Sequence, residues 1–212
     1  MRVEPTDVRR LWAERTGAYS PTYYAHHGPD ERSEAVLDVF GTFLDPGAAV
    51  LELGCSSGRH LARLHEAGFG ELHGIDLNPE AFEVMAETYP ALADAGTFHV
   101  GAIERLVPEF DDGRFDAVFS VETLQHVHPE DAWVFEELVG ITDDLVVVVE
   151  NEGDEGGDGG GERGGRADEV RHVDDGIPLY VRAWDDVFGN LGLDPVRTEA
   201  LGRDTLRAFR RR

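Results

Sequence analysis

Val50-Leu-Glu-Leu-Gly-Cys-Ser-Ser-Gly-Arg-His60 predicts a buried strand, a tight glycine turn and the first turn of a helix. The apolar run that starts at Ala48 ends in Gly54, and an amphipathic segment begins at Gly58. Because Gly54 has no Cβ, a ligand can approach the backbone of this turn closely. The helix that follows offers unpaired N–H groups to a polar or anionic ligand. We therefore expect a ligand site at this turn.

The next strand indicates which kind of ligand fits. Glu71-Leu-His-Gly-Ile-Asp76 reads as a second strand that ends in an acid, 22 residues after Gly54. An acid at this point is placed to bind a ribose diol. The dinucleotide fingerprint G-x-G-x-x-G is absent, because Ser56 stands where a second glycine admits the pyrophosphate. The pattern predicts a nucleoside site without pyrophosphate and disfavours a nicotinamide-dependent oxidoreductase.

These segments resemble the motifs of class I S-adenosylmethionine-dependent methyltransferases over about residues 35 to 150. The matching stretches are the first motif Val50-Leu-Glu-Leu-Gly-Cys-Ser-Ser-Gly58, the ribose-binding strand Gly74-Ile-Asp-Leu-Asn-Pro79, the fourth strand Phe115-Asp-Ala-Val-Phe-Ser-Val121 with Leu124-Gln-His126, and the fifth strand Leu145-Val-Val-Val-Val-Glu150. The resemblance implies a Rossmann-like, doubly wound α/β fold with a mostly parallel seven-stranded sheet and an antiparallel C-terminal hairpin edge. It also implies S-adenosyl-L-methionine as the cofactor.

The resemblance and the turn together predict a set of cofactor-binding residues: Glu52, Gly54, Cys55, Ser56, Gly58, Asp76, Leu77, Ile103 and Ser120. For Cys55, a small residue packed under the cofactor is a better interpretation than a reactive thiol. Members of the family often carry an acid after the third strand that contacts the adenine amino group, and this chain has Ala102 there. Adenine recognition by backbone groups or by another side chain stays open.

Elements alternate along the chain as a parallel sheet covered by helices requires. We expect strands near 48–53, 71–76, 97–100, 115–121 and 144–150, a hairpin of 195–201 and 205–210, and helices near 6–16, 33–43, 58–67, 79–88, 130–140 and 184–191. Residues 1–212 are predicted to form a single domain. The stretch 151–169 contains eight glycines and seven acids, which predicts a disordered loop.

Composition limits the partners. The net charge is −24, and all 19 basic residues are arginine. A strongly acidic surface disfavours nucleic acids and anionic membranes, which leaves a small molecule as the expected acceptor. Together with the missing lysine, the acidity resembles proteins of salt-loving archaea and predicts adaptation to a high-salt cytoplasm. The absence of a signal peptide and of a membrane span, and the single cysteine, also favour a cytoplasmic protein. The oligomeric state stays open.

The N-terminal arm, residues 1–45, carries an aromatic and histidine-rich stretch: Tyr19, Tyr23, Tyr24, His26 and His27. In similar methyltransferases such a segment folds over the cofactor and helps to build the substrate pocket. A lid and a plainly packed arm are equally compatible with the sequence. We expect no metal site there, because adjacent histidines rarely converge on one ion.

Two histidines follow the fourth predicted strand. His126 is the candidate general base, since an ordinary histidine titrates near neutral pH, although a packed loop histidine is equally consistent. His128 precedes Pro129 and is better explained as a helix cap. The main alternative to a methyltransferase is a methyltransferase-like protein that binds the nucleoside without catalysis.

Overall fold

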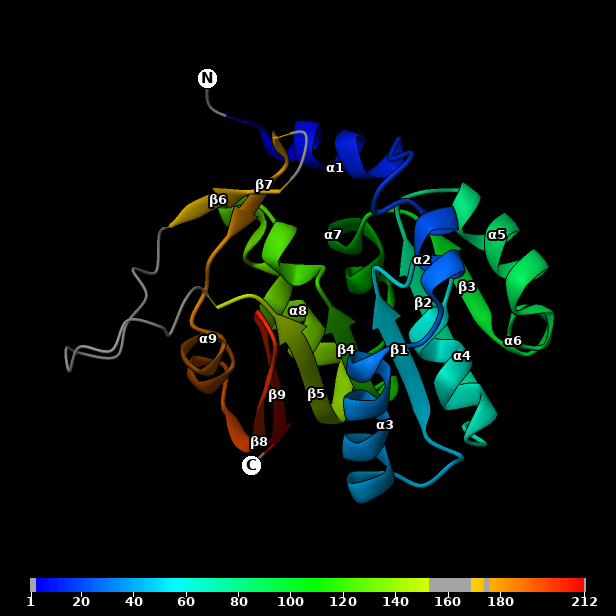
Figure 1. Ribbon diagram of the computed structural model, residues 1–212. Helices are drawn as coiled ribbons and strands as arrows, with labels where there is room; N and C mark the ends of the chain where they lie inside the picture. The colour runs from blue at the N-terminus through cyan, green and yellow to red at the C-terminus, as the bar shows by residue number, and fades with distance from the viewer. Residues whose placement is uncertain (1–2, 153–168, 174–175, 212) are drawn as a thin grey trace.

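The computed structural model describes residues 3–152, 169–173 and 176–211. Its centre is a seven-stranded sheet in the order β3-β2-β1-β4-β5-β9-β8 (Figure 1). The strands are β1 Ala49–Leu53, β2 Glu71–Asp76, β3 Thr97–Val100, β4 Phe115–Val121, β5 Thr142–Glu150, β8 Leu193–Leu201 and β9 Asp204–Arg211. The first five run parallel, and β9 lies antiparallel between β5 and β8. The predicted fold class is confirmed.

Helices cover both faces of the sheet because its central strands are apolar on both sides. Val50 on β1 packs in one core with the helices α3 Glu31–Phe43, α4 Arg59–Glu66, α5 Glu80–Thr88 and α6 Pro90–Ala95. Leu51 packs in a second core with α7 Ile103–Leu106, α8 Val134–Ile141 and α9 Trp184–Asn190. None of the described helices combines the length and apolarity needed to cross a membrane.

Two short helices lie beyond these layers. They are α1 Pro5–Ala13 and α2 Pro21–His27. Figure 1 shows α1 lying across the edge of the sheet at which the arrowheads of the parallel strands point. Parallel α/β sheets bind their ligands outside this carboxyl edge. The N-terminal arm therefore lies where a ligand is expected.

Several elements differ from the predictions. Of the stretch of tyrosines and histidines, all but Tyr19 lie on α2, which begins at Pro21. The side chain of the preceding Ser20 accepts a hydrogen bond from the Tyr23 N–H. The helix predicted at 130–140 is divided into a single 3-10 turn, η3 Pro129–Asp131, and α8. The fourth strand is followed by another such turn, η2 Leu124–His126. Sequence periodicity misses such turns because each contains only three residues.

A second, two-stranded sheet also goes beyond the prediction. It consists of β6 Val170–His172 and β7 Pro178–Tyr180, paired antiparallel. Strands of three residues show no clear alternation of polar and apolar positions. The predicted disordered loop, 151–169, lies outside the described residues except for Asn151, Glu152 and Glu169.

Candidate active site

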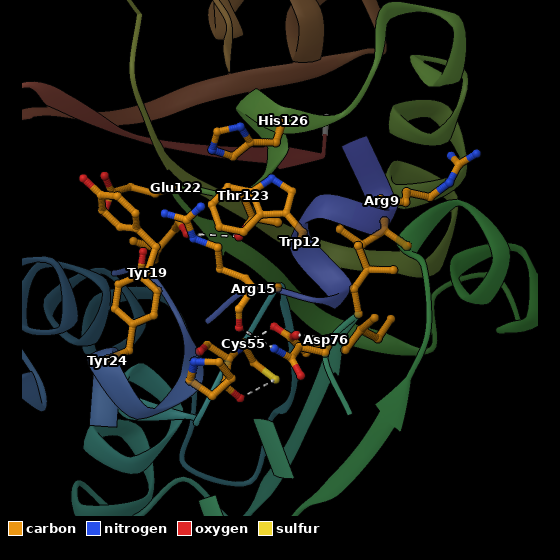
Figure 2. Close-up of a pocket in the computed structure, with 18 of the residues that line it drawn as sticks. Arg9, Trp12, Arg15, Tyr19, Tyr24, Cys55, Asp76, Glu122, Thr123 and His126 are labelled. Carbon is orange, nitrogen blue, oxygen red and sulfur yellow. Dashed lines mark hydrogen bonds between the residues drawn. The ribbon is translucent and has the colours of Figure 1, made fainter. Parts of the chain in front are cut away.

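A cavity opens at the carboxyl edge of β1, β2 and β4, beneath α1 and α2. Nine of the predicted site residues line it: Gly54, Cys55, Ser56, Asp76, Leu77, Ile103, Tyr19, Tyr24 and His126. Figure 2 shows Asp76 and Cys55 at one end of the cavity and His126 with Trp12 at the other. Residues from the two ends of this cavity are far apart in the sequence, so only the folded sheet brings them together.

Backbone conformation and packing, as well as a ligand, explain why glycine stands at two positions of this turn. Gly54 adopts a left-handed backbone with φ of 69°. A Cβ there would clash with the side chain of Thr123, which packs over the turn. Gly58 also has a positive φ, and a Cβ there would lie 2.7 Å from Cε of Met85. Gly58 does not line the cavity; it allows α4 to pack against α5.

Asp76, at the end of β2, is a half-buried acid in the cavity wall. One carboxylate oxygen accepts a hydrogen bond from the Ser56 N–H at 2.8 Å, and the other accepts one from the Asn78 N–H at 2.8 Å. A carboxylate oxygen has two lone pairs, so both oxygens retain the capacity to accept a further hydroxyl donor. Burial raises the pKa of Asp76 to about 6. A diol donates hydrogen bonds, so it would bind the ionised carboxylate in preference to the protonated acid.

Backbone strain concentrates on this cavity. Among the described residues, the three non-glycine residues with positive φ are Tyr19 at 64°, Ser56 at 47° and Glu122 at 50°. All three line the cavity. Left-handed backbone is unfavourable for residues with a Cβ and persists where the surroundings hold it, commonly at functional sites. The arrangement is typical of a ligand site that is formed before the ligand arrives.

Two of the predicted cofactor residues lie behind the cavity wall. Glu52 is buried on the face of β1 that α4 covers, and its Oε2 has no hydrogen-bond partner. Burial raises the pKa of this carboxyl group well above its usual value, against the attraction of Arg59. Ser120 is also buried and donates a 2.6 Å hydrogen bond to Glu150 Oε1. Side chains alternate along a strand, and this alternation turns Ser120 away from the cavity.

The N-terminal arm covers the cavity with aromatic side chains, Trp12, Tyr19 and Tyr24, which we call the roof. Tyr24 lines the cavity, and its ring centroid lies 4.7 Å from the Arg59 guanidinium carbon. Burial raises the pKa of Tyr24, so the phenol stays neutral at physiological pH. Tyr23 and His26 belong to the same helix but do not line the cavity. A helix presents only one face to a neighbour, which separates these residues from Tyr24.

Sequence reasoning missed Trp12 as a cavity residue. The spacing of Val8, Leu11 and Trp12 predicts an apolar helix face, which is typical of core packing. In the structure Trp12 lines the cavity, its indole lies 4.7 Å from the His126 ring between centroids, and its Nε1 is buried without a partner. No local signal distinguishes such a tryptophan from a core residue, because the cavity forms only in the tertiary structure.

His126 is held in one orientation. Its Nδ1 lies 2.8 Å from the carbonyl oxygen of Pro178 on β7. A carbonyl oxygen only accepts, so Nδ1 carries the proton and Nε2 keeps its lone pair, which the Gln125 amide nitrogen approaches at 3.5 Å. Burial lowers the pKa of His126 to about 4. His128 instead caps η3, because its Nδ1 accepts the Glu130 N–H at 3.1 Å, as predicted.

The part of the chain that the structure describes offers no cluster of metal ligands. No group of three or more His, Cys, Asp or Glu side chains there could hold a metal ion. Cys55 is a free, buried thiol, and burial raises its pKa well above the usual value. A protonated thiol is a weak nucleophile, which fits the interpretation of Cys55 as a packing residue.

Residues 50–143 match the methyltransferase domain family. This segment runs from β1 to the start of β5 and contains the glycine turn, Asp76 and the loop after β4. The O-methyltransferase cnsE of Penicillium expansum is 27% identical over 137 residues, which represent 58% of this chain and 50% of that protein. The chain thus spans about half the length of that curated relative.

Solved structures agree over nearly the whole chain. Magnesium protoporphyrin IX methyltransferase from Synechocystis PCC 6803, with bound SAH, has a TM-score of 0.69 at 16% identity and covers 99% of this chain and 100% of its own. The 1,6-didemethyltoxoflavin-N1-methyltransferase of Burkholderia thailandensis has a TM-score of 0.64 at 16% identity, covering 98% and 83%. The fold of this chain is therefore the Rossmann-like methyltransferase fold.

Proposed function

We propose that this protein transfers a methyl group from S-adenosyl-L-methionine to a small-molecule acceptor. One observation carries the proposal: a single cavity joins the glycine turn and Asp76 to a chamber walled by Trp12, Tyr19 and His126. The match of residues 50–143 to the methyltransferase domain family supports it. Fold alone does not fix function, so the proposal rests on this site.

The residues at the first end of the cavity fit the cofactor. Both Asp76 oxygens can accept ribose hydroxyls, and Leu77 and Ile103 offer apolar walls beside them. Ala102 has no acid to meet the adenine amino group, whereas Glu104, two residues later, lines the cavity. When bound, the cofactor supplies an electrophilic methyl carbon. The protein then has to orient the acceptor and exclude water, for which the aromatic roof is suited.

We assign the proton-accepting role to His126. Its Nδ1 proton is committed to the carbonyl oxygen of Pro178, which leaves Nε2 as the acceptor. The lowered pKa keeps the ring neutral at physiological pH, so the lone pair is present. A base with so low a pKa is weak, which favours an acceptor whose hydroxyl or N–H is already acidic. The low pKa is also the observation that keeps the non-catalytic, nucleoside-binding alternative in view.

The acceptor is proposed to be a small molecule with an apolar or aromatic body, because aromatic side chains wall its chamber. The O-methyltransferase from Penicillium expansum and the didemethyltoxoflavin methyltransferase support this class. A high-salt cytoplasm is proposed as the working environment, on the net charge of −24 and the absence of lysine.

Calorimetry in molar KCl tests the cofactor. S-adenosylmethionine and S-adenosylhomocysteine should bind, and NAD should not. A screen of metabolite extracts with methyl-labelled cofactor then tests transfer, with His126→Asn as the active-site variant and His128→Asn as its matched control. Binding of the nucleosides without any transfer would favour the non-catalytic alternative. Binding of NAD as tight as that of S-adenosylmethionine would refute the cofactor assignment.

A further inference from the structure

The segment after β4 supplies four cavity residues without being part of the sheet. Glu122, Thr123, His126 and Val127 all line the cavity. The segment leaves the sheet at Glu122, whose N–H is the last to bond to β5, through the Val149 carbonyl. Beyond this point, the position of His126 depends on contacts other than the strand ladder.

Glu150, the last residue of β5, binds this segment from one side. Its Oε1 accepts the Thr123 N–H at 3.2 Å and the Leu124 N–H at 2.9 Å, and its Oε2 accepts the Gln125 N–H at 3.2 Å. The Ser120 hydroxyl adds the fourth hydrogen bond. Three consecutive N–H groups thus converge on one fully buried carboxyl group, and these hydrogen bonds are strongest above its pKa of about 7, where the acceptor is charged.

Arg182, which follows β7, binds the same segment through its carbonyl groups. The guanidinium donates to the Leu124 oxygen at 3.1 Å and to the Val127 oxygen. The rings of Phe135, Tyr180 and Trp184 surround the guanidinium at 5.3 to 5.7 Å between its central carbon and the ring centroids. Glu150 therefore accepts hydrogen bonds from the N–H groups of this short segment, and Arg182 donates hydrogen bonds to its carbonyl groups. The charges of the two side chains also attract each other.

From this geometry we infer that Glu150 and Arg182 are positioning residues, which clamp the segment 122–127 so that His126 faces the acceptor chamber in a single tautomer. The inference rests on the proposed function for its catalytic meaning. Neither residue lines the cavity, so both act through the segment they hold. Leu124 is bound on its N–H by Glu150 and on its carbonyl by Arg182. Pro178, which lies on β7 four residues before Arg182, accepts the hydrogen bond from the His126 ring through its carbonyl oxygen.

The test is ¹⁵N NMR of the histidine rings in Glu150→Gln and Arg182→Lys. In the unchanged protein, His126 should show one tautomer, protonated on Nδ1, and a pKa of about 4. Both variants should show mixed tautomers and a His126 pKa raised by at least one unit, because a loosened ring becomes solvated. Glu122 and Arg203 keep their charges in both variants, and Arg182→Lys keeps the positive charge that lowers the His126 pKa, so no charge beside His126 is removed in either variant. Calorimetry with S-adenosylhomocysteine should give affinities within about threefold, since Asp76 lies on another strand.

The opposite end of β5 provides the matched controls. Asp144 and Arg210 form a two-bond ion pair at 2.7 and 2.8 Å, remote from the cavity. Asp144→Asn and Arg210→Lys should leave the His126 spectrum unchanged. A folded Glu150→Gln and Arg182→Lys pair with an unchanged His126 spectrum would overturn the inference. Loss of folding in both would overturn it as well, because it would assign the two residues to the core. The spectra need no methyl acceptor, so absence of transfer would count only against the proposed function.

Discussion

Replacing Asp76 by Asn separates the proposed cofactor site from a mere surface acid through its pH dependence. Burial raises the pKa of Asp76 to about 6. Ribose hydroxyls donate hydrogen bonds, so they bind the ionised carboxylate more tightly than the protonated acid, which has less acceptor capacity. At pH 5 roughly one Asp76 in eleven is ionised, which predicts a loss of about tenfold in affinity relative to pH 7.5, or about 1.4 kcal/mol.

The assay is calorimetric titration of S-adenosylhomocysteine at pH 5, 6 and 7.5 in constant molar KCl. The unchanged protein should lose affinity as the pH falls, whereas Asp76→Asn should bind weakly at every pH. His60 and His126 do not interfere, because burial lowers their pKa values to about 3 and about 4. Glu150, with a pKa raised to about 7 by burial, titrates in the same range. Its contribution persists in Asp76→Asn and can be subtracted.

The pH dependence of the free energy of unfolding is a second test of the Asp76 pKa. A folded-state pKa above the usual value of 3.8 means that Asp76 stabilises the fold below that pH, and that this contribution is lost as the pH rises through about 6. The loss amounts to at most about 3 kcal/mol. The ligand-free protein should therefore lose stability between pH 4 and 6 relative to Asp76→Asn. Affinity that is flat with pH, or an Asp76→Asn variant that binds normally, would refute the reasoning.

Three further predictions concern the surface, the roof and the turn. The melting temperature should rise as KCl increases to about 1 M, where screening is nearly complete; a flat or falling curve would contradict the salt adaptation. Joint replacement of Tyr19 and Tyr24 by Ala should weaken calorimetric binding of S-adenosylhomocysteine at least tenfold, about 1.4 kcal/mol, while Tyr23→Ala, outside the cavity, should stay within about threefold. Denaturant unfolding should show Gly54→Ala destabilised by at least about 1 kcal/mol, because of its positive φ and Thr123, whereas Gly47→Ala, in open space, should be neutral.

Much of the fold follows from local sequence patterns. The predicted strands at 71–76, 97–100 and 115–121 have the observed bounds, and the C-terminal hairpin and the antiparallel edge are present. Apolar runs bounded by glycine and turn residues are local signals, and the parallel sheet follows from their alternation with helices. The site end that contains Gly54 and Asp76 was predictable for the same reason, since each residue ends a recognisable strand.

The other end of the cavity was not predictable in this way. Trp12 has the spacing of a core residue, Ser120 has that of a cleft residue, and both assignments change in the folded chain. From the sequence, Glu150 can be recognised only as the acid that ends a predicted strand. Its three N–H partners follow β4, 27 to 25 residues earlier in the chain.

The sequence by itself therefore determined the order of strands and helices, the glycine turn and the acid at the ribose position, because hydrophobic periodicity and backbone freedom act over a few neighbouring residues. Only the tertiary structure decided which side chains enclose the cavity, how the segment 122–127 is held, and which nitrogen of His126 carries the proton. Those features depend on burial and on hydrogen bonds between residues far apart in the chain, such as Trp12, His126 and Arg182, and they come into existence only when the sheet has formed.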